Sequence, residues 1–298
     1  MPGSAEPNAA PRAAELSVVI PAFNAAATII GQLRALVCQT WSRPWEVIVA
    51  DNGSTDDTAA MVSAFAVSHP MVRLVDAGQR SGPASARNAG VEHAVGRYVA
   101  FCDADDIVGD TWLRAMGEGL QKQIVVTGPQ EQALLNPPWL RNVYGSSLAT
   151  DAQTFAGIFP FCASANLGIR RDVFVELGGF DPELSVGEDL EFCLRLWNKG
   201  IELSFVPDAM IHYRNRSSVF ALWKQSVEYG KAAPMICRRL AALHRPTPPP
   251  WRGLKNWLWL LRKLPTLRSR PGRARWVVVA GNSAGRLLGS LKQRRLYL

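Results

Sequence analysis

The chain has 298 residues, 48% of them hydrophobic, and a net charge of +8. This size and composition fit one large α/β domain or two smaller ones and exclude a disordered protein. Five scattered cysteines without a CxxC pair argue against a disulfide framework or a zinc site and fit a reducing cytosol. Residues 1–15 are rich in Ala and Pro, so we predict a flexible N-terminal tail rather than a signal peptide.

Short apolar segments alternate with helical segments through the first hundred residues. The expected elements are strands at 16–21, 46–51, 71–75 and 98–102, and helices at 26–38, 55–68 and 82–95. This alternation predicts βαβ units and a mostly parallel sheet flanked by helices. The strands are apolar throughout, which indicates a sheet covered on both faces.

The second half of the chain is less regular at first. Residues 129–164 read as a loop-rich subdomain. Further short elements follow at 165–171, 172–177, 188–199, 201–206 and 209–213, and Ser217 or Ser218 is placed to cap a long helix reaching about residue 243. Four prolines in 245–250 indicate a linker. We therefore expect one domain at 16–244 and a separate helical extension at 251–298.

Carboxylates gather where predicted strands end. Asp103, Asp105 and Asp106 follow one strand, and Asp51 ends another. The carboxyl ends of parallel strands open on one edge of a sheet, where such folds bind ligands. Oxygen ligands there suit Mg²⁺ or Mn²⁺ shared with a phosphate-bearing substrate. A solvated acidic turn, and for Asp51 an Asx turn, are the alternatives.

Three further positions are candidates for chemistry. Arg87 lies in a helix start rich in small residues, within reach of phosphate or of the acids after the fourth strand. Glu188 and Asp189 begin a helix, where acids favour the helix dipole but one carboxylate can also act as a general base. A lone histidine is more often structural than a ligand, but His212 lies next to an arginine near a strand end, which makes contact with metal or phosphate an alternative.

Taken together, these segments resemble family-2 glycosyltransferases of the GT-A fold. The resemblance covers about residues 16–240 and rests on several segments in order: VVIPAFN at 18–24, VIVADNGSTD at 47–56, ARNAG at 86–90, DADD at 103–106, GGFD at 178–181, GED at 187–189, and His212. It implies an enzyme that transfers a sugar, with inversion, from a nucleotide-diphosphate sugar to a hydroxyl of a glycan or lipid-linked acceptor in cell-surface polysaccharide synthesis. Residues 16–128 would form the nucleotide-binding half and 129–244 the acceptor and catalytic half.

The resemblance also implies a nucleotide site. Pro21, Phe23 and Asn24 would border the nucleotide, and Asp51 would hold the base, with a UDP-sugar as the expected donor. Arg87 would help at the nucleotide and its phosphates. Ala25-Ala26 departs from the family pattern, in which many members carry Glu after the Asn.

A metal site and a catalytic pair are implied as well. Asp105 and Asp103 would bind Mg²⁺ or Mn²⁺, and His212 would reach the metal or the diphosphate. Asp189 would be the catalytic base, with Glu188 assisting its position. Asp106 would orient the sugar or support the site. Asn166 and the 178–181 turn would shape the sugar and acceptor pocket.

The C-terminal extension is strongly basic. Residues 251–298 hold twelve Lys and Arg and no acid, which leaves the rest of the chain at −4. On a helical wheel, one face carries Leu254, Trp257, Leu258, Leu260, Leu261 and Leu264. This pattern predicts a basic amphipathic helix in peripheral contact with the inner face of the cell membrane; packing of the apolar face on the domain is the alternative. Gly281, Gly285 and Gly289 predict close helix packing within the extension or against another subunit, so a homo-oligomer is possible.

Other functions fit the sequence less well. A nucleotidyltransferase is expected to carry a Gly-rich basic loop after the first strand, where this chain has Ala22-Phe23-Asn24-Ala25-Ala26. A sugar-nucleotide-binding module without activity is disfavoured by the intact acids at 103, 105 and 189. The basic, aromatic extension also fits nucleic-acid binding, but we expect no nucleic-acid partner.

Overall fold

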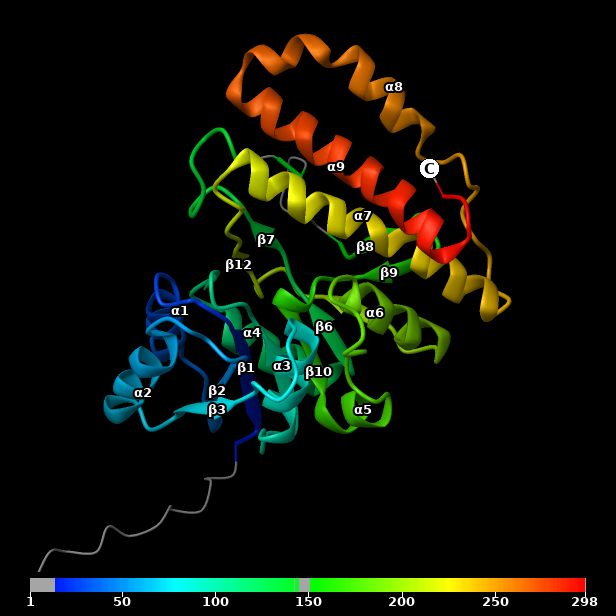
Figure 1. Ribbon diagram of the computed structural model, residues 1–298. Helices are drawn as coiled ribbons and strands as arrows, with labels where there is room; N and C mark the ends of the chain where they lie inside the picture. The colour runs from blue at the N-terminus through cyan, green and yellow to red at the C-terminus, as the bar shows by residue number, and fades with distance from the viewer. Residues whose placement is uncertain (1–13, 142, 145–150, 298) are drawn as a thin grey trace, which may run out of the picture.

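The computed structural model describes residues 14–141, 143–144 and 151–297 (Figure 1). Most of the expected N-terminal tail, residues 1–13, lies outside this range. A seven-stranded sheet in the order β11-β6-β10-β4-β1-β2-β3 forms the centre. Its strands are β1 (Leu16–Ala22), β2 (Trp45–Asp51), β3 (Val72–Asp76), β4 (Tyr98–Phe101), β6 (Val125–Thr127), β10 (Leu167–Arg170) and β11 (Leu203–Phe205).

The pairing confirms the predicted mostly parallel sheet. Strand β1 runs parallel to both β2 and β4, β2 is parallel to β3, and β11 is parallel to β6. Only β10 is antiparallel to its neighbours β4 and β6. The four parallel strands β1 to β4 therefore bring their carboxyl ends to one edge, above β1 in Figure 1.

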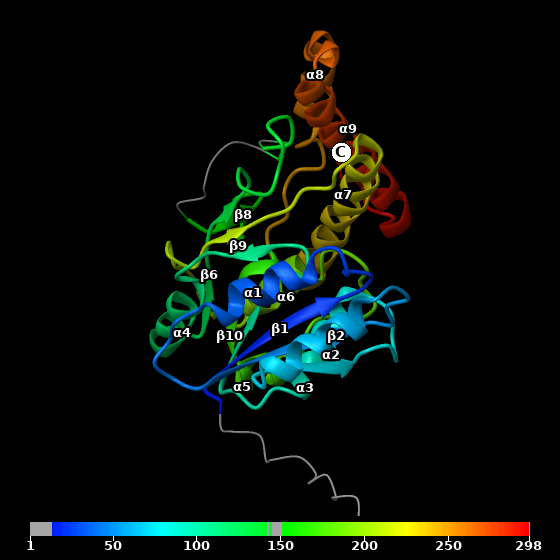
Figure 2. The ribbon, with the colours of Figure 1, turned by 90° about the vertical axis from the view of Figure 1, so that its left-hand side faces the viewer.

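Helices cover both faces of the sheet, as the apolar strands predicted (Figure 2). Alternate strand residues point to opposite cores. Val18 and Ile20 pack toward one core with side chains of α1, α2 and α4, whereas Val19 packs toward the other with α3, α5 and α6. The helices are α1 (Ile29–Val37), α2 (Thr58–Ser68), α3 (Pro83–Glu92), α4 (Trp112–Lys122), α5 (Arg171–Glu176) and α6 (Glu188–Asn198).

Two small sheets lie beyond this edge. The first joins β5 (Ile107–Val108), β12 (Ile211–His212) and β7 (Gln130–Glu131), and so brings the segment after His212 beside the acidic cluster. The second is the hairpin of β8 (Gln153–Phe155) and β9 (Phe159–Phe161), followed by the 3-10 turn η1 (Ser164–Asn166). The stretch predicted as loop-rich thus contains short strands, and residues 142 and 145–150 of it lie outside the described part.

A helical layer stands above the sheet edge (Figure 1). It contains α7 (Val219–Ala242), α8 (Leu254–Arg262), the 3-10 turn η2 (Leu264–Arg268) and α9 (Arg270–Gln293). Ser218 caps α7 as expected, since its hydroxyl accepts a hydrogen bond from the Ala221 N–H at 3.1 Å. Helix α9 lies along α7, and α8 lies on the side of α9 away from the sheet.

The glycine stripe of the extension packs on the domain itself. A Cβ atom added to Gly285 would lie 2.1 Å from the Val227 carbonyl oxygen, and one on Gly230 of α7 would lie 2.2 Å from the Asn282 carbonyl oxygen. The two backbones touch because neither helix has a side chain at the crossing. The prediction that the glycine stripe packs within the extension or against a second subunit is therefore wrong, because the stripe packs against α7.

Candidate active site

A crevice of about 620 Å³ opens where β1, β2 and β4 end. Its walls include most of the residues that the sequence assigned to the nucleotide and metal, drawn from three separate loops and α3. These are Pro21, Phe23, Asn24, Arg87, Asp103 and Asp105, together with Asn52, Arg214 and Arg216. Phe23 is 61% exposed at the rim, so an aromatic ring is free to contact a ligand.

Asn24 lines this crevice, and Asp51 lies behind its lining. Asn24 has a left-handed backbone (φ 49°), and its Oδ1 accepts a hydrogen bond from the Thr55 N–H at 2.8 Å, which ties the loop after β1 to the loop after β2. Asp51 lies one residue behind the lining residue Asn52. Its Oδ2 accepts the Ser54 N–H at 3.2 Å, as in the Asx turn, while its Oδ1 is buried without a partner. That orphaned oxygen remains available to a donor group of a ligand.

The three aspartates after β4 converge. Oxygen atoms of Asp103, Asp105 and Asp106 lie within 4.8 Å of one another. Burial raises the pKa of Asp105, and the Asp103 carboxylate raises it further; burial and both neighbouring carboxylates raise the pKa of Asp106 well above its ordinary value. One Asp106 oxygen is buried without a partner. An oxygen-rich, mutually repelling cluster of this kind fits a hard divalent cation.

Two arginines that the sequence analysis did not assign reach the same cluster. Arg214 donates its backbone N–H to Asp106 Oδ1 at 2.8 Å and its Nε–H to the Asp105 carbonyl at 2.8 Å. Arg216 Nη1 lies 3.2 Å from Asp105 Oδ2. In the sequence these arginines follow His212 by two and four residues. In the structure β12 pairs with β5, and this pairing carries both arginines past the acids.

His212 pairs with a glutamate and is not part of the aspartate group. Its Nδ1 lies 2.8 Å from Glu131 Oε2. Among the described residues, the group of potential ligands that the structure brings together contains only the three aspartates. Metal binding by His212 stays a prediction.

Arg87 joins the acidic cluster to the helix start at 188. Its side chain is 4% exposed, with Nη2 2.6 Å from Asp103 Oδ1 and Nη1 3.0 Å from Glu188 Oε1. A second, larger cavity of about 1120 Å³ begins here and is lined by Arg87, Asp103, Glu188 and Asp189. Arg87 and Asp103 line both cavities, so they form the boundary between them.

The acids at the start of α6 are unusually basic carboxylates. Burial, followed by repulsion from Asp189, raises the pKa of Glu188 to about 7. Burial also raises the pKa of Asp189, although its Oδ1 accepts the Leu190 N–H at 2.7 Å. Gly187 allows this turn because it has φ 80° and because a Cβ there would lie 2.6 Å from the Ala232 Cβ on α7. A carboxylate with a raised pKa in a cavity is suited to proton abstraction.

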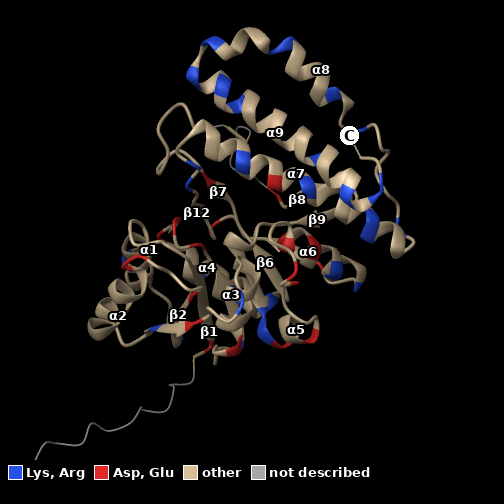
Figure 3. Cartoon of the chain, in the orientation of Figure 1, with Lys and Arg blue, Asp and Glu red and all other residues tan. Residues whose placement is uncertain are grey.

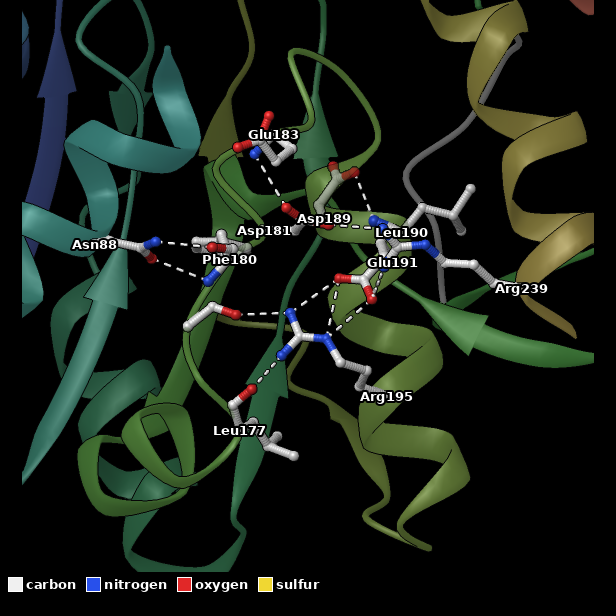
Figure 4. A network of polar contacts seen from close by, with 11 residues as sticks. Asn88, Leu177, Phe180, Asp181, Glu183, Asp189, Leu190, Glu191, Arg195 and Arg239 are labelled. Atoms are coloured by element: carbon white, nitrogen blue, oxygen red, sulfur yellow. Dashed lines mark hydrogen bonds and ion pairs between the residues drawn. The ribbon is translucent and has the colours of Figure 1, made fainter. Parts of the chain in front are cut away.

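A partly buried polar network fixes α6 (Figure 4). Asn88 of α3 exchanges two hydrogen bonds with the Phe180 backbone at 2.8 and 2.9 Å. Arg195 of α6 donates to the Gly179 carbonyl at 2.6 Å, and Arg239 of α7 pairs with Asp181 at 2.6 Å. The 178–181 turn therefore links three helices and acts behind the cavities, not in their lining.

Asn166 has a similar supporting place. It is fully buried, and its side-chain amide accepts from Trp112 Nε1 at 2.7 Å and donates to the Ala209 carbonyl at 2.9 Å. These bonds occupy both ends of the amide, so Asn166 holds the frame of the pocket without offering a group to a ligand.

The crevice at the strand ends, the acidic cluster and the layered sheet define the GT-A class of nucleotide-sugar enzymes. Residues 17–178 match the family model described as Glycosyl transferase family 2, and residues 98–270 match Glycosyl transferase family group 2. The chain belongs to Glycosyl transferase family 2.

Curated relatives agree with this assignment. Glycosyltransferase AglE of Haloferax volcanii is 28% identical over 201 residues, which are 65% of each chain. The pre-mycofactocin glycosyltransferase of Mycobacterium tuberculosis is 29% identical over 242 residues, 78% of this chain and 50% of the relative. The chain thus spans between half and two thirds of the length of these relatives.

Solved structures share the fold. The mannosyltransferase PcManGT from Pyrobaculum calidifontis, in complex with GDP-Man and Mn²⁺, has a TM-score of 0.67 at 18% identity. The match covers 95% of this chain and 88% of the PcManGT chain. The fragment 1–349 of S. aureus TarS in complex with UDP-GlcNAc has a TM-score of 0.54 at 16% identity, and the match covers 95% of this chain and 93% of that fragment.

Proposed function

We propose that this protein is a divalent-cation-dependent, inverting glycosyltransferase that moves a sugar from a nucleotide-diphosphate sugar to a hydroxyl acceptor. The observation that carries the proposal is the Arg87 bridge between Asp103 of the acidic cluster and Glu188 of the catalytic pair. This bridge supports a metal site and a base close to each other, because Glu188 precedes the proposed base Asp189 and both acids line the second cavity together with Arg87. Such spacing suits a donor in one cavity and an acceptor in the other.

The chemistry needs these groups in these places. Asp105 and Asp103 would hold Mg²⁺ or Mn²⁺, which when bound would neutralise the charge that develops on the departing diphosphate. Arg87 and Arg216 point to the same region and would stabilise that charge as well. Asp189, in the adjoining cavity, would take the proton of the acceptor hydroxyl as it attacks from the opposite side. Attack from that side inverts the anomeric centre.

A UDP-sugar is the proposed donor. Asp51 has one buried oxygen free of partners at the end of β2, where a base or ribose donor would lie. The TarS complex binds UDP-GlcNAc and PcManGT binds GDP-Man, so relatives of this fold take more than one nucleotide. A role in surface polysaccharide synthesis is supported by relatives such as the succinoglycan biosynthesis protein ExoO of Rhizobium meliloti, 38% identical over 112 residues.

The donor assignment is tested by nucleotide release. The purified chain is incubated with UDP- and GDP-sugars and Mn²⁺ or Mg²⁺, alongside Asp189→Ala and the exposed control Phe220→Ala. We expect release that is lost on chelation and in Asp189→Ala but kept in the control. Turnover of no nucleotide sugar would leave only a binding module, and full activity of Asp189→Ala would remove the assigned base.

Peripheral contact with the cytoplasmic face of the membrane is a second proposal, carried by the surface of α8. Of the apolar face predicted for this helix only Leu260 is buried, against α9. The rest of it stays exposed: Leu254 47%, Trp257 37%, Leu258 55%, Leu261 66% and Leu264 48%. The alternative, in which this face packs on the domain, does not occur in the structure. Among the described residues, no helix combines the length and apolarity that crossing a bilayer demands.

Charge favours an anionic lipid surface as the occupant of that face. Figure 3 shows Lys and Arg along α8 and α9, and no acid occurs after Glu228. Each basic residue near an anionic membrane adds about 1 kcal/mol. We expect the protein to sediment with vesicles containing phosphatidylglycerol and to lose this in Leu258→Gln/Leu261→Gln, with Val67→Gln, an exposed apolar residue of α2, as the control. Retention on duplex DNA but not on vesicles would point instead to nucleic acid.

A further inference from the structure

The larger cavity extends well beyond the catalytic pair. From Asp189 it continues along the inner side of α7, where Gln225 and Tyr229 line it, and it meets Tyr144 from the segment before β8. At about 1120 Å³ it exceeds the volume of a single sugar ring and is of the size that holds a ligand of several rings. None of these three side chains has a part in the chemistry proposed above.

The three side chains form one hydrogen-bonded row. Tyr144 Oη donates to Gln225 Oε1 at 2.7 Å, and Gln225 Nε2 donates to Tyr229 Oη at 3.0 Å. The tyrosines are 36% and 42% exposed, so their rings are open to the cavity. Each ring presents an apolar face with a polar rim, and the amide between them fixes their relative position. The row therefore offers flat apolar surface and directional polar groups at the same wall.

The wall is rigid because the extension supports it. Helix α9 contacts α7 backbone to backbone at Gly230 and Gly285, and Gly230 directly follows Tyr229 in α7. Asn282 of α9 also lines the cavity. The extension is thus built into the second cavity, although the sequence suggested a separate unit.

We propose that Tyr144, Gln225 and Tyr229 form the acceptor subsite and that they bind a pyranose ring, so that the acceptor is a glycan or the sugar part of a glycolipid. This rests on the proposed function, since it assigns the second substrate of the same site. A sugar presents apolar C–H faces and hydroxyls at its rim, which matches the row. A lipid chain would need a continuous apolar wall, and the exposed apolar stripe of this chain lies instead on α8, outside the cavity.

The kinetic test uses p-nitrophenyl glycopyranosides as acceptors with a donor that the protein turns over. Tyr229→Phe keeps the ring and loses the hydroxyl, so the acceptor KM is expected to rise about 5-fold, whereas Tyr229→Ala should raise it by about 20-fold or more. The donor KM should stay the same, which a general loss of structure would not allow. Phe220→Ala, at the exposed start of α7, is the matched control. An unchanged acceptor KM in Tyr229→Ala would overturn the proposal, and so would turnover of prenyl phosphates but of no glycoside.

A binding test separates this inference from the proposed function. Saturation-transfer NMR with methyl glycopyranosides measures contact with the protein without any donor. Signals in the native chain that fall in Tyr229→Ala and Gln225→Ala support the subsite even if no donor is turned over. Equal signals in the native chain and both variants, or none in the native chain at millimolar glycoside, would refute it.

Discussion

Arg87→Met removes a buried cation that pairs with two acids, Asp103 and Glu188. The guanidinium makes ion pairs of 2.6 Å with Asp103 and 3.0 Å with Glu188, and all three side chains are between 4% and 28% exposed. Deleting one partner of a buried pair costs about 3–5 kcal/mol, because the remaining charge is left desolvated. Asp103 is the more exposed acid and is partly rehydrated, so we expect a loss near the lower limit, about 3 kcal/mol in the free energy of unfolding.

The loss should depend on pH in a defined direction. The pKa of Glu188 is raised from 4.5 to about 7 in the folded protein even with Arg87 present. A carboxyl with a raised folded pKa stabilises the fold at low pH and loses that contribution as pH rises through the folded value. Without the guanidinium this pKa rises further. The difference between Arg87→Met and the native chain should therefore be larger at pH 8 than at pH 5.

Urea denaturation followed by circular dichroism at both pH values measures this. Arg170→Met is the control, since its pair with Asp172 is 35% and 64% exposed and contributes about 0–1 kcal/mol. Equal stability of Arg87→Met and the control, or a penalty that shrinks as pH rises, would refute the reasoning.

Three further predictions concern the same site and its support. Asp189→Asn should lower kcat by about 10²–10⁴-fold while nucleotide affinity, measured by calorimetry, is retained; a smaller drop would remove the general base. The pH profile of kcat/KM should fall toward acid with an apparent pKa well above that of an ordinary carboxyl, because burial raises the pKa of both Glu188 and Asp189; a flat profile down to about pH 5 contradicts this. Gly285→Val should lower the thermal unfolding midpoint, because a Cβ atom there would lie 2.1 Å from the Val227 carbonyl oxygen. The control Leu287→Val, on the exposed side of α9, should leave the midpoint unchanged. Equal midpoints for the two variants would contradict the close α7–α9 contact.

Local patterns in the sequence predicted most of the sheet and the convergence of the acids. Runs of β-branched residues gave β1 and β2, and a short apolar run gave β4. The rule that parallel strands end at one edge placed Asp103 and Asp105 beside Pro21. Helix starts were less accurate. Helix α1 begins at Ile29 and not at 26, and the N–H groups of Ala25 and Ala26 instead tie the preceding loop to Thr58 and Asp56.

Long-range pairing was beyond the sequence. His212 faces Glu131, 81 positions earlier, because β12 pairs with β7, and no local pattern encodes that choice. The glycine stripe in α9 was visible, but its complement is a single Gly230 in α7, which has no periodic signal of its own. The row from Tyr144 to Tyr229 was likewise hidden, since its members are polar residues that become neighbours only after α7 docks.

We propose that the acidic cluster holds a divalent cation together with a nucleotide diphosphate. Electron paramagnetic resonance of Mn²⁺ measures this directly, in the native chain and in Asp105→Asn, with and without UDP or GDP. We predict that the free Mn²⁺ signal falls with the native chain, falls further when one of the two nucleotides is added, and is largely restored in Asp105→Asn. A free signal that stays the same with the native chain and either nucleotide would contradict the account.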